Sequence, residues 1–141
     1  MELELELAKQ DTPAALAFME LHGSFRSARS EVFMALLDGP KSSPVSAMVR
    51  RLAPRLAPLR YEEEDGPRVG VIAYLAQLSE PQDLPELRRS LVSENAREFI
   101  YAIEAVLKLK DQEAIPRLKT VSYSDSVFAV RAKDALVLLS N

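Results

Sequence analysis

A proline recurs at a fixed interval along this chain, each time followed by a charged residue and a leucine. The prolines stand at Pro54, Pro85 and Pro116, which are separated by 31 residues in each case. Repeats of about 20 to 50 residues are typical of solenoids, because one such unit cannot bury its own apolar face and must stack on copies of itself. The interval therefore predicts a chain built from similar, stacked units.

Apolar residues keep nearly the same interval and indicate what each unit contains. They form trios spaced three and four positions apart, and residues with this spacing line one side of an α-helix. The trios are Val71, Leu75 and Leu78; Ala102, Val106 and Leu109; and Ala132, Leu136 and Leu139. Each unit is therefore predicted to be a proline-led helix, a turn and a longer amphipathic helix. The fold class that follows is all-α: a short right-handed α-α superhelix, or α-solenoid, of about four helical hairpins.

The repeat also predicts the organisation of the chain. We expect a single domain over residues 1–141, with units at approximately 11–39, 44–79, 82–110 and 112–140. Residues 41–60 contain three prolines, so we expect a kinked or split helix there. Residues 1–10 form an N-terminal extension in which leucine alternates with glutamate. This period of two fits either a strand that pairs with another segment or a frayed end, and the sequence leaves both open.

Several helix ends have recognisable signals. Asp11 or Thr12 is expected to cap the first helix, with Pro13 in its first turn. Gly23 suits the left-handed position after that helix, and His22 suits the negative end of the helix dipole. The polar turns at 93–95 and 124–126 are expected to supply further N-caps.

Composition limits the classes of function. With 141 residues, of which 48% are hydrophobic, the chain is long enough for one continuous core. It contains no cysteine, which excludes disulfides, a thiolate nucleophile and a cysteine-based metal site, and we expect a cytoplasmic location. No stretch approaches the ~18 apolar residues that a membrane span requires, so we expect a soluble protein. The formal charge of -3 disfavours a polyanionic partner.

The last unit carries a family resemblance. Residues 111–118 read Asp-Gln-Glu-Ala-Ile-Pro-Arg-Leu, and they are followed by an apolar set consisting of Phe128, Ala132, Ala135, Leu136 and Leu139. This pattern resembles a HEAT-like repeat of the short, phycobilisome-lyase-like type. Residues 83–109 resemble the same repeat, and residues 53–79 and 11–39 match it less well. The resemblance implies HEAT-like helical hairpins over nearly the whole chain. HEAT-like proteins are mostly scaffolds and adaptors, so it also implies a non-enzymatic protein–protein interaction role.

The same family includes bilin lyases, DNA glycosylases and metal-dependent hydroxylases, so alternatives remain. The hydroxylases bind metal through paired His-Glu motifs, whereas this chain has the single histidine His22 and no His-Glu pair. We therefore predict no catalytic residue, no metal ligand and no cofactor. A lyase-like or chaperone-like helper for a cofactor-bearing protein is the main alternative. The acidic run at 62–65 lacks the alternating spacing of a calcium loop and is read as a solvated turn.

A nucleic-acid-binding module is the less favoured alternative. Arg50, Arg51, Arg55 and Arg60 form a basic cluster that a phosphate backbone suits, but the acidic run at 62–65 follows directly and is expected to neutralise it. The chain has no tryptophan and only 6% aromatic residues, which disfavours a pocket for a flipped base.

An interaction surface can be placed from the repeat register. In a HEAT-like solenoid the second helices line the concave side, so their non-core positions face a partner. The predicted partner-binding residues are Gln77, Arg97, Tyr101, Glu104, Lys108, Arg131 and Asp134. Gly70 and Ala73 are expected to be exposed beside Gln77, and Tyr101 is the leading candidate because tyrosine is frequent in binding hot spots. The alternative is a solvated helix face with a local ion pair between Glu104 and Lys108.

The end of the last unit is unusually apolar. Residues 135–139 read Ala-Leu-Val-Leu-Leu, whereas terminal repeats normally present a polar outer face. We therefore predict weak homo-oligomerisation through a terminal repeat, in addition to the binding of another protein.

Overall fold

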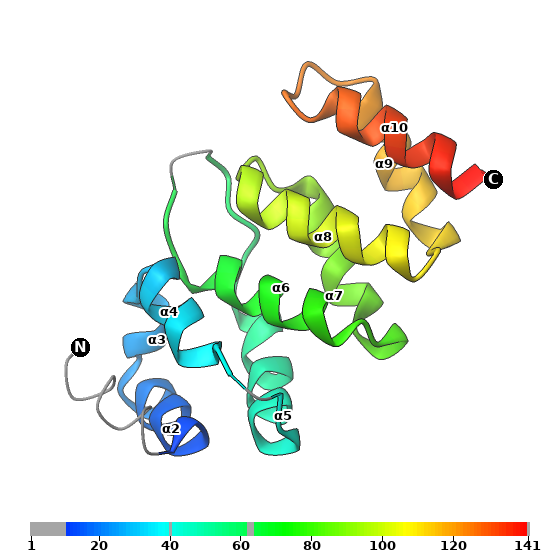
Figure 1. The fold of residues 1–141 in the computed structure, drawn as a ribbon. Helices are drawn as coiled ribbons and strands as arrows, with labels where there is room; N and C mark the ends of the chain where they lie inside the picture. Colours follow the sequence, from blue (N-terminus) through cyan, green and yellow to red (C-terminus); the bar gives the residue numbers. More distant parts are fainter. Residues whose placement is uncertain (1–10, 40, 62–63, 141) are drawn as a thin grey trace.

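The computed structural model describes residues 11–39, 41–61 and 64–140, and all regular secondary structure within these ranges is helical (Figure 1). The predicted all-α class is confirmed. The alternating segment 1–10 lies outside the described residues. The helices are α2 (Thr12–His22), α3 (Ser24–Ser27), α4 (Ser30–Leu37), α5 (Ser43–Leu52), α6 (Pro67–Leu78), α7 (Leu84–Arg89), α8 (Ala96–Lys108), α9 (Ile115–Ser122) and α10 (Ala129–Ser140). Short 3₁₀ turns occupy Ala53–Arg55, Pro81–Asp83, Ser90–Val92 and Gln112–Ala114.

The longer helices pack in a regular order. α6 lies between α4 and α8 and contacts both of them, and α10 packs against α9 and α8 (Figure 1). Each of α6, α8 and α10 also contacts a shorter helix that precedes it in the chain, namely α5, α7 and α9 respectively. The apolar trios of the sequence lie on these longer helices, except for Leu109, which directly follows α8. Six of their nine residues are buried, and the other three, Leu78, Leu109 and Leu136, are half-buried. Repetition in the sequence thus corresponds to a repeated pairing of a short helix with a long one.

Local signals set the helix ends as expected. The Asp11 side chain accepts a hydrogen bond from the Ala14 N–H, and α2 ends at Gly23, whose φ of 71° lies in the left-handed region. The Asn95 side chain caps α8 by accepting from the backbone N–H groups of Arg97 and Glu98. These capping predictions are confirmed because each depends only on residues close in sequence.

The region predicted to be irregular is split. α5 ends at Leu52 and passes into the 3₁₀ turn Ala53–Arg55, because Pro54 has no N–H to continue an α-helix. An extended connection then leads to α6, which begins at Pro67. The second helical segment of the first unit is interrupted, since α3 ends at Ser27 and α4 begins at Ser30.

A buried arginine ties this connection to the core. Arg68, in the first turn of α6, is 1% exposed. Its guanidinium donates to the carbonyl oxygens of Ala53 at 2.8 Å and Leu56 at 3.1 Å, and to the Ser90 hydroxyl at 2.9 Å. It also pairs with the Glu86 carboxylate at 2.5 Å. Arg68 therefore joins the end of α5, the start of α6 and α7.

Glu98 completes this buried network from α8. Its side chain is fully buried, accepts the Leu59 N–H at 2.9 Å and lies 3.6 Å from Arg68 Nε. Burial raises the pKa of the Glu98 carboxyl, although the hydrogen bond from Leu59 and the charge of Arg68 oppose the increase. The sequence analysis identified neither residue, because the pair is assembled from two helices that are 30 positions apart in the sequence.

Candidate partner-binding groove

α6 forms the floor of a groove whose walls are α4 and α8. α4 and α6 approach each other closely because Gly70 of α6 has no side chain. A Cβ at this position would lie 3.1 Å from Phe33 Cδ1 and 3.3 Å from Met34 Cγ, both on α4. Gly70 and Ala73 were expected to be exposed, and this prediction is wrong, since both are buried. The repeat register predicted which positions of α6 are buried against the neighbouring helix α8. It did not predict the contact with α4, which covers the other side of α6.

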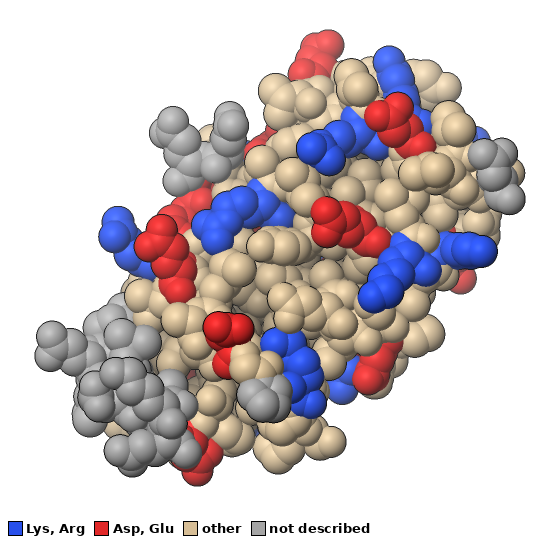
Figure 2. Space-filling model, viewed as in Figure 1, with Lys and Arg blue, Asp and Glu red and all other residues tan. Residues whose placement is uncertain are grey.

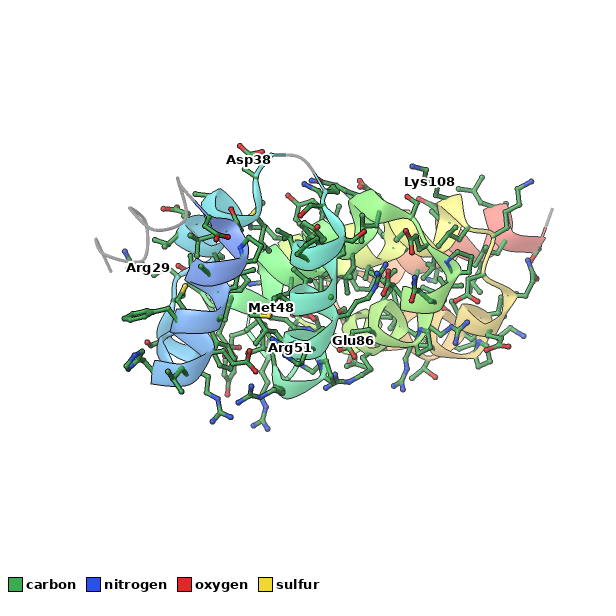
Figure 3. The ribbon with its side chains drawn as sticks, turned by 90° about the horizontal axis from the view of Figure 1, so that it is seen from below. Arg29, Asp38, Met48, Arg51, Glu86 and Lys108 are labelled. Atoms are coloured by element: carbon green, nitrogen blue, oxygen red, sulfur yellow. The ribbon has the colours of Figure 1, made fainter. Side chains whose placement is uncertain are left out.

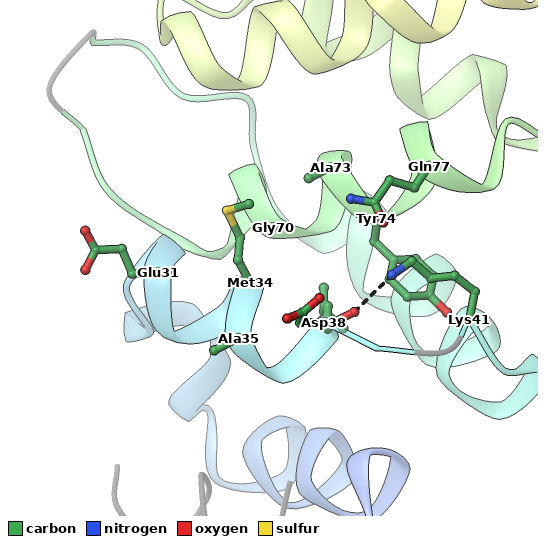
Figure 4. A pocket seen from close by; sticks show the side chains of 10 residues that line it. Glu31, Met34, Ala35, Asp38, Lys41, Gly70, Ala73, Tyr74 and Gln77 are labelled. Carbon is green, nitrogen blue, oxygen red and sulfur yellow. Dashed lines mark hydrogen bonds between the residues drawn. The ribbon is translucent and has the colours of Figure 1, made fainter. Parts of the chain in front are cut away.

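Two hollows make up the groove. The hollow between α4 and α6 has a volume of about 420 Å³, and its lining includes Glu31, Met34 and Asp38 from α4 (Figure 4). The hollow between α6 and α8 has a volume of about 190 Å³. Both hollows include Ala73 and Gln77 in their lining, so they adjoin each other along α6.

Four of the seven predicted partner-binding residues meet in this groove. Gln77, Tyr101, Glu104 and Lys108 all line the hollow between α6 and α8. Tyr101 is half-buried, and the other three side chains are exposed. The repeat register therefore selected residues of α6 and α8 that lie side by side in the structure.

Arg97 has a different position. It is exposed, yet its guanidinium donates to the Ser30 hydroxyl at 3.0 Å and to Met34 Sδ at 3.0 Å, both on α4. Arg97 thus bridges from the start of α8 to the opposite wall of the groove. Arg131 and Asp134 are exposed on α10, and neither lines the two hollows.

Charged side chains of the groove walls are largely unpaired. Within the described ranges, Glu31, Asp38, Glu104 and Lys108 have no hydrogen bond or ion pair through their side chains, so the ion pair between Glu104 and Lys108 that the alternative interpretation included is not formed. Lys41 is the exception, because its ammonium donates to two backbone carbonyls at the end of α4, each at 3.2 Å. Figure 2 shows acidic and basic side chains interspersed over this face, with no large patch of a single sign.

Three arginines of the basic cluster predicted at 50–60 pair with carboxylates of other segments. Arg50 pairs with Asp83 at 2.9 Å and with Glu80 at 2.8 Å. Arg51 and Arg55 both pair with Glu20 of α2, at 3.2 Å and 2.9 Å. In Figure 3, Asp38 and Lys108 lie at the upper edge of the molecule and Arg51 lies below them. Arg50, Arg51 and Arg55 therefore hold α2, α5 and the start of α7 together.

Other candidate chemistry receives structural explanations. His22 lies in the last turn of α2, and its ring is 4.3 Å from the Phe18 ring, centroid to centroid. Over the described part of the chain, no three histidine, aspartate or glutamate side chains are grouped as a metal site would require. None of the described helices combines the length and apolar character needed to span a bilayer.

Comparison with protein-family models, with curated proteins and with solved structures finds no match for this chain. The resemblance to HEAT-like repeats rests on the residues quoted from the sequence, and the evidence on function comes from the groove.

Proposed function

We propose that this chain is a short α-solenoid of about four HEAT-like hairpins that acts without catalysis, as an adaptor that binds another protein through the groove. The pairing of α5 with α6, α7 with α8 and α9 with α10 supports the solenoid arrangement, because each pair carries one copy of the sequence repeat. The partner-binding face predicted from the repeat register comprised residues of α6, α8 and α10. The groove also includes residues of α4.

The observation that carries the proposal is the meeting of Gln77, Tyr101, Glu104 and Lys108 around one hollow, where their side chains form no hydrogen bond or ion pair with the described residues. Tyr101 packs partly against the core, and its remaining exposed surface and the other three side chains are free to contact another molecule. Tyrosine beside charged residues is also the composition that dominates binding hot spots.

The groove is suited to binding because its floor is rigid. Val71, Ile72 and Leu75 fix α6 in the core, and each is no more than 1% exposed. A binding surface that is ordered before the partner arrives loses little conformational entropy on association, so more of the contact energy appears as affinity.

A polypeptide partner fits the charge distribution better than a nucleic acid. Arg50, Arg51 and Arg55 are already paired with carboxylates, so they offer no free cationic patch to a phosphate backbone. The exposed charges around the groove include both signs, which suits the mixed side chains of a protein surface.

The test is affinity capture from the host extract with the wild-type chain, a groove variant and a matched control. The groove variant is Tyr101→Ala/Glu104→Lys. The control, Tyr123→Ala/Asp125→Lys, makes the same chemical changes at two exposed residues outside the groove. Circular dichroism verifies the fold of all three, and titration of the purified captured protein gives dissociation constants.

We expect a protein that binds the wild type and the control and binds the groove variant at least tenfold more weakly. Equal binding to all three would contradict the groove as the site. Retention of a chromophore or of nucleic acid in place of a protein would favour the cofactor-helper or nucleic-acid alternative, and binding of nucleic acid would weaken steeply with added salt.

A further inference from the structure

The wall formed by α4 carries two carboxylates at the rim of the larger hollow. Glu31 lies in the first turn of α4 and Asp38 directly follows the helix, so the two residues that line the hollow are about two turns, or roughly 10 Å, apart along this wall. Asp38 directly follows α4, at the end where the helix dipole is negative. This wall therefore presents negative charge at both of its ends.

The cations near this hollow are already engaged. The Lys41 ammonium is held by the carbonyl oxygens of Leu37 and Gly39 and lies 4.8 Å from the centre of the Tyr74 ring. Arg97 contacts Ser30 and Met34. Neither forms an ion pair with Glu31 or Asp38 in the described part of the protein, so these two carboxylates have their acceptor positions free.

The floor between the walls is neutral and narrow. Along α6, Gly70 and Ala73 present almost no side chain, and the uncharged polar residues Tyr74 and Gln77 also line the hollow. Met34 and Ala35 add apolar surface on the α4 side (Figure 4). A long side chain with an apolar stem and a cationic end matches this combination, because the stem covers the apolar surface while the charge reaches the carboxylates.

We propose that the groove binds a polypeptide segment with a lysine or arginine side chain in the α4–α6 hollow, where the cation lies between Glu31 and Asp38 and is attracted to both carboxylates. The inference rests on the proposed function and adds the chemistry of the partner. A polypeptide fits better than a free cation because the hollow adjoins the one lined by Tyr101, so the backbone beside the basic residue has a surface to contact.

The experiment is selection of randomised heptapeptides displayed on phage against the immobilised full chain, followed by titration of the retained peptides in solution. The charge variant is Glu31→Gln/Asp38→Asn. Its control is Glu94→Gln/Asp125→Asn, which removes two exposed carboxylates outside the groove and changes the net charge equally. Tyr101→Ala reports on the groove independently of these charges.

We expect retained peptides to be enriched in lysine or arginine at one position and to bind the charge variant about three- to tenfold more weakly, with the control unchanged. Peptides that lose affinity with Tyr101→Ala but show no basic preference and bind the charge variant normally would overturn the inference and leave the proposed function standing. Peptides unaffected by Tyr101→Ala, or no retained peptide, would contradict the proposed function as well.

Discussion

The groove side of the molecule and the side around α5, α7 and α9 use their charged residues differently. Away from the groove, Arg50 pairs with Glu80 and Arg88 pairs with Asp111, so an arginine of one short helix contacts an acidic residue just before the next. Glu80 and Asp111 are 31 residues apart, which is the interval of the proline repeat. These ion pairs therefore connect successive units.

In the groove, Arg97 and Lys41 make contacts within the protein, but four other charged side chains form no hydrogen bond or ion pair in the described part of the chain. These are Glu31, Asp38, Glu104 and Lys108, which lie on or directly after helices that the apolar core already holds together. The contrast indicates that one set of charged residues is needed for stability and the other is available for recognition. The predictions below test that division by measuring folding and binding separately.

The largest effect on folding is expected from Arg68→Ala. The substitution leaves the buried Glu98 without its cation and removes hydrogen bonds to two backbone carbonyls, and breaking a buried pair on one side typically costs about 3 to 5 kcal/mol. Urea unfolding monitored by circular dichroism measures the loss. Arg131→Ala, at an exposed site on α10, is the control, and a loss no larger than the control would refute a structural role for this network.

A smaller loss is expected from Arg88→Ala. Asp111 is largely buried and receives two hydrogen bonds from Arg88, at 2.6 and 2.8 Å. Removing the guanidinium leaves this carboxylate without its main partner, which costs roughly 1 to 3 kcal/mol. The same urea experiment applies, and a double-mutant cycle with Asp111→Asn separates the pair from other contacts of either residue. A coupling near zero would mean that this pair does not join the units.

The free energy of unfolding should depend on pH through the ionisation of the Glu98 carboxyl. Its pKa is raised in the folded state, so its contribution is fully present below the usual carboxyl pKa and is lost as the pH rises through the folded pKa. We therefore expect the wild type to lose stability relative to Glu98→Gln as the pH increases above about 4.5. Urea titrations at several pH values check this. A difference that is constant with pH, or that changes in favour of the wild type, would contradict the direction of the shift.

The smallest effects on folding are expected in the groove. Glu104→Ala and Lys108→Ala each remove an exposed side chain that has no partner in the described structure, so each should change the free energy of unfolding by less than about 0.5 kcal/mol. The same variants should weaken binding of the captured protein. A destabilisation comparable to that of Arg88→Ala would show that the groove charges also support the fold.

How far the sequence could predict this structure depended on how local each signal was. The caps at Asp11 and Asn95 involve neighbouring residues and were predicted, as were the four groove residues that keep the repeat register. Glu98 follows the Asn95 cap by three residues, a position where a glutamate often turns back to the helix end. Here it points to Arg68 instead, because packing of α6 on α8 brings that guanidinium within 3.6 Å.

The α4 wall was missed for a related reason. The first proline-led helix begins at Pro13, 41 residues before Pro54 rather than 31, so the register that located Gln77 and Tyr101 does not extend back to Glu31 and Asp38. Burial of Gly70 beneath α4 was missed with it. Contacts made by an irregular unit depend on the path of its connections, and periodicity carries no information about that path.

The most direct test of the division between the two sides is to map a bound peptide on the isotope-labelled chain by amide chemical shifts, with the tightest heptapeptide from the selection as the probe. We expect the largest shift changes on α6 and α8 around Gln77, Tyr101 and Lys108 and on α4 around Glu31, with little change at Arg50 and Arg88. Changes concentrated on α5, α7 and α9, with the groove unaffected, would contradict this division.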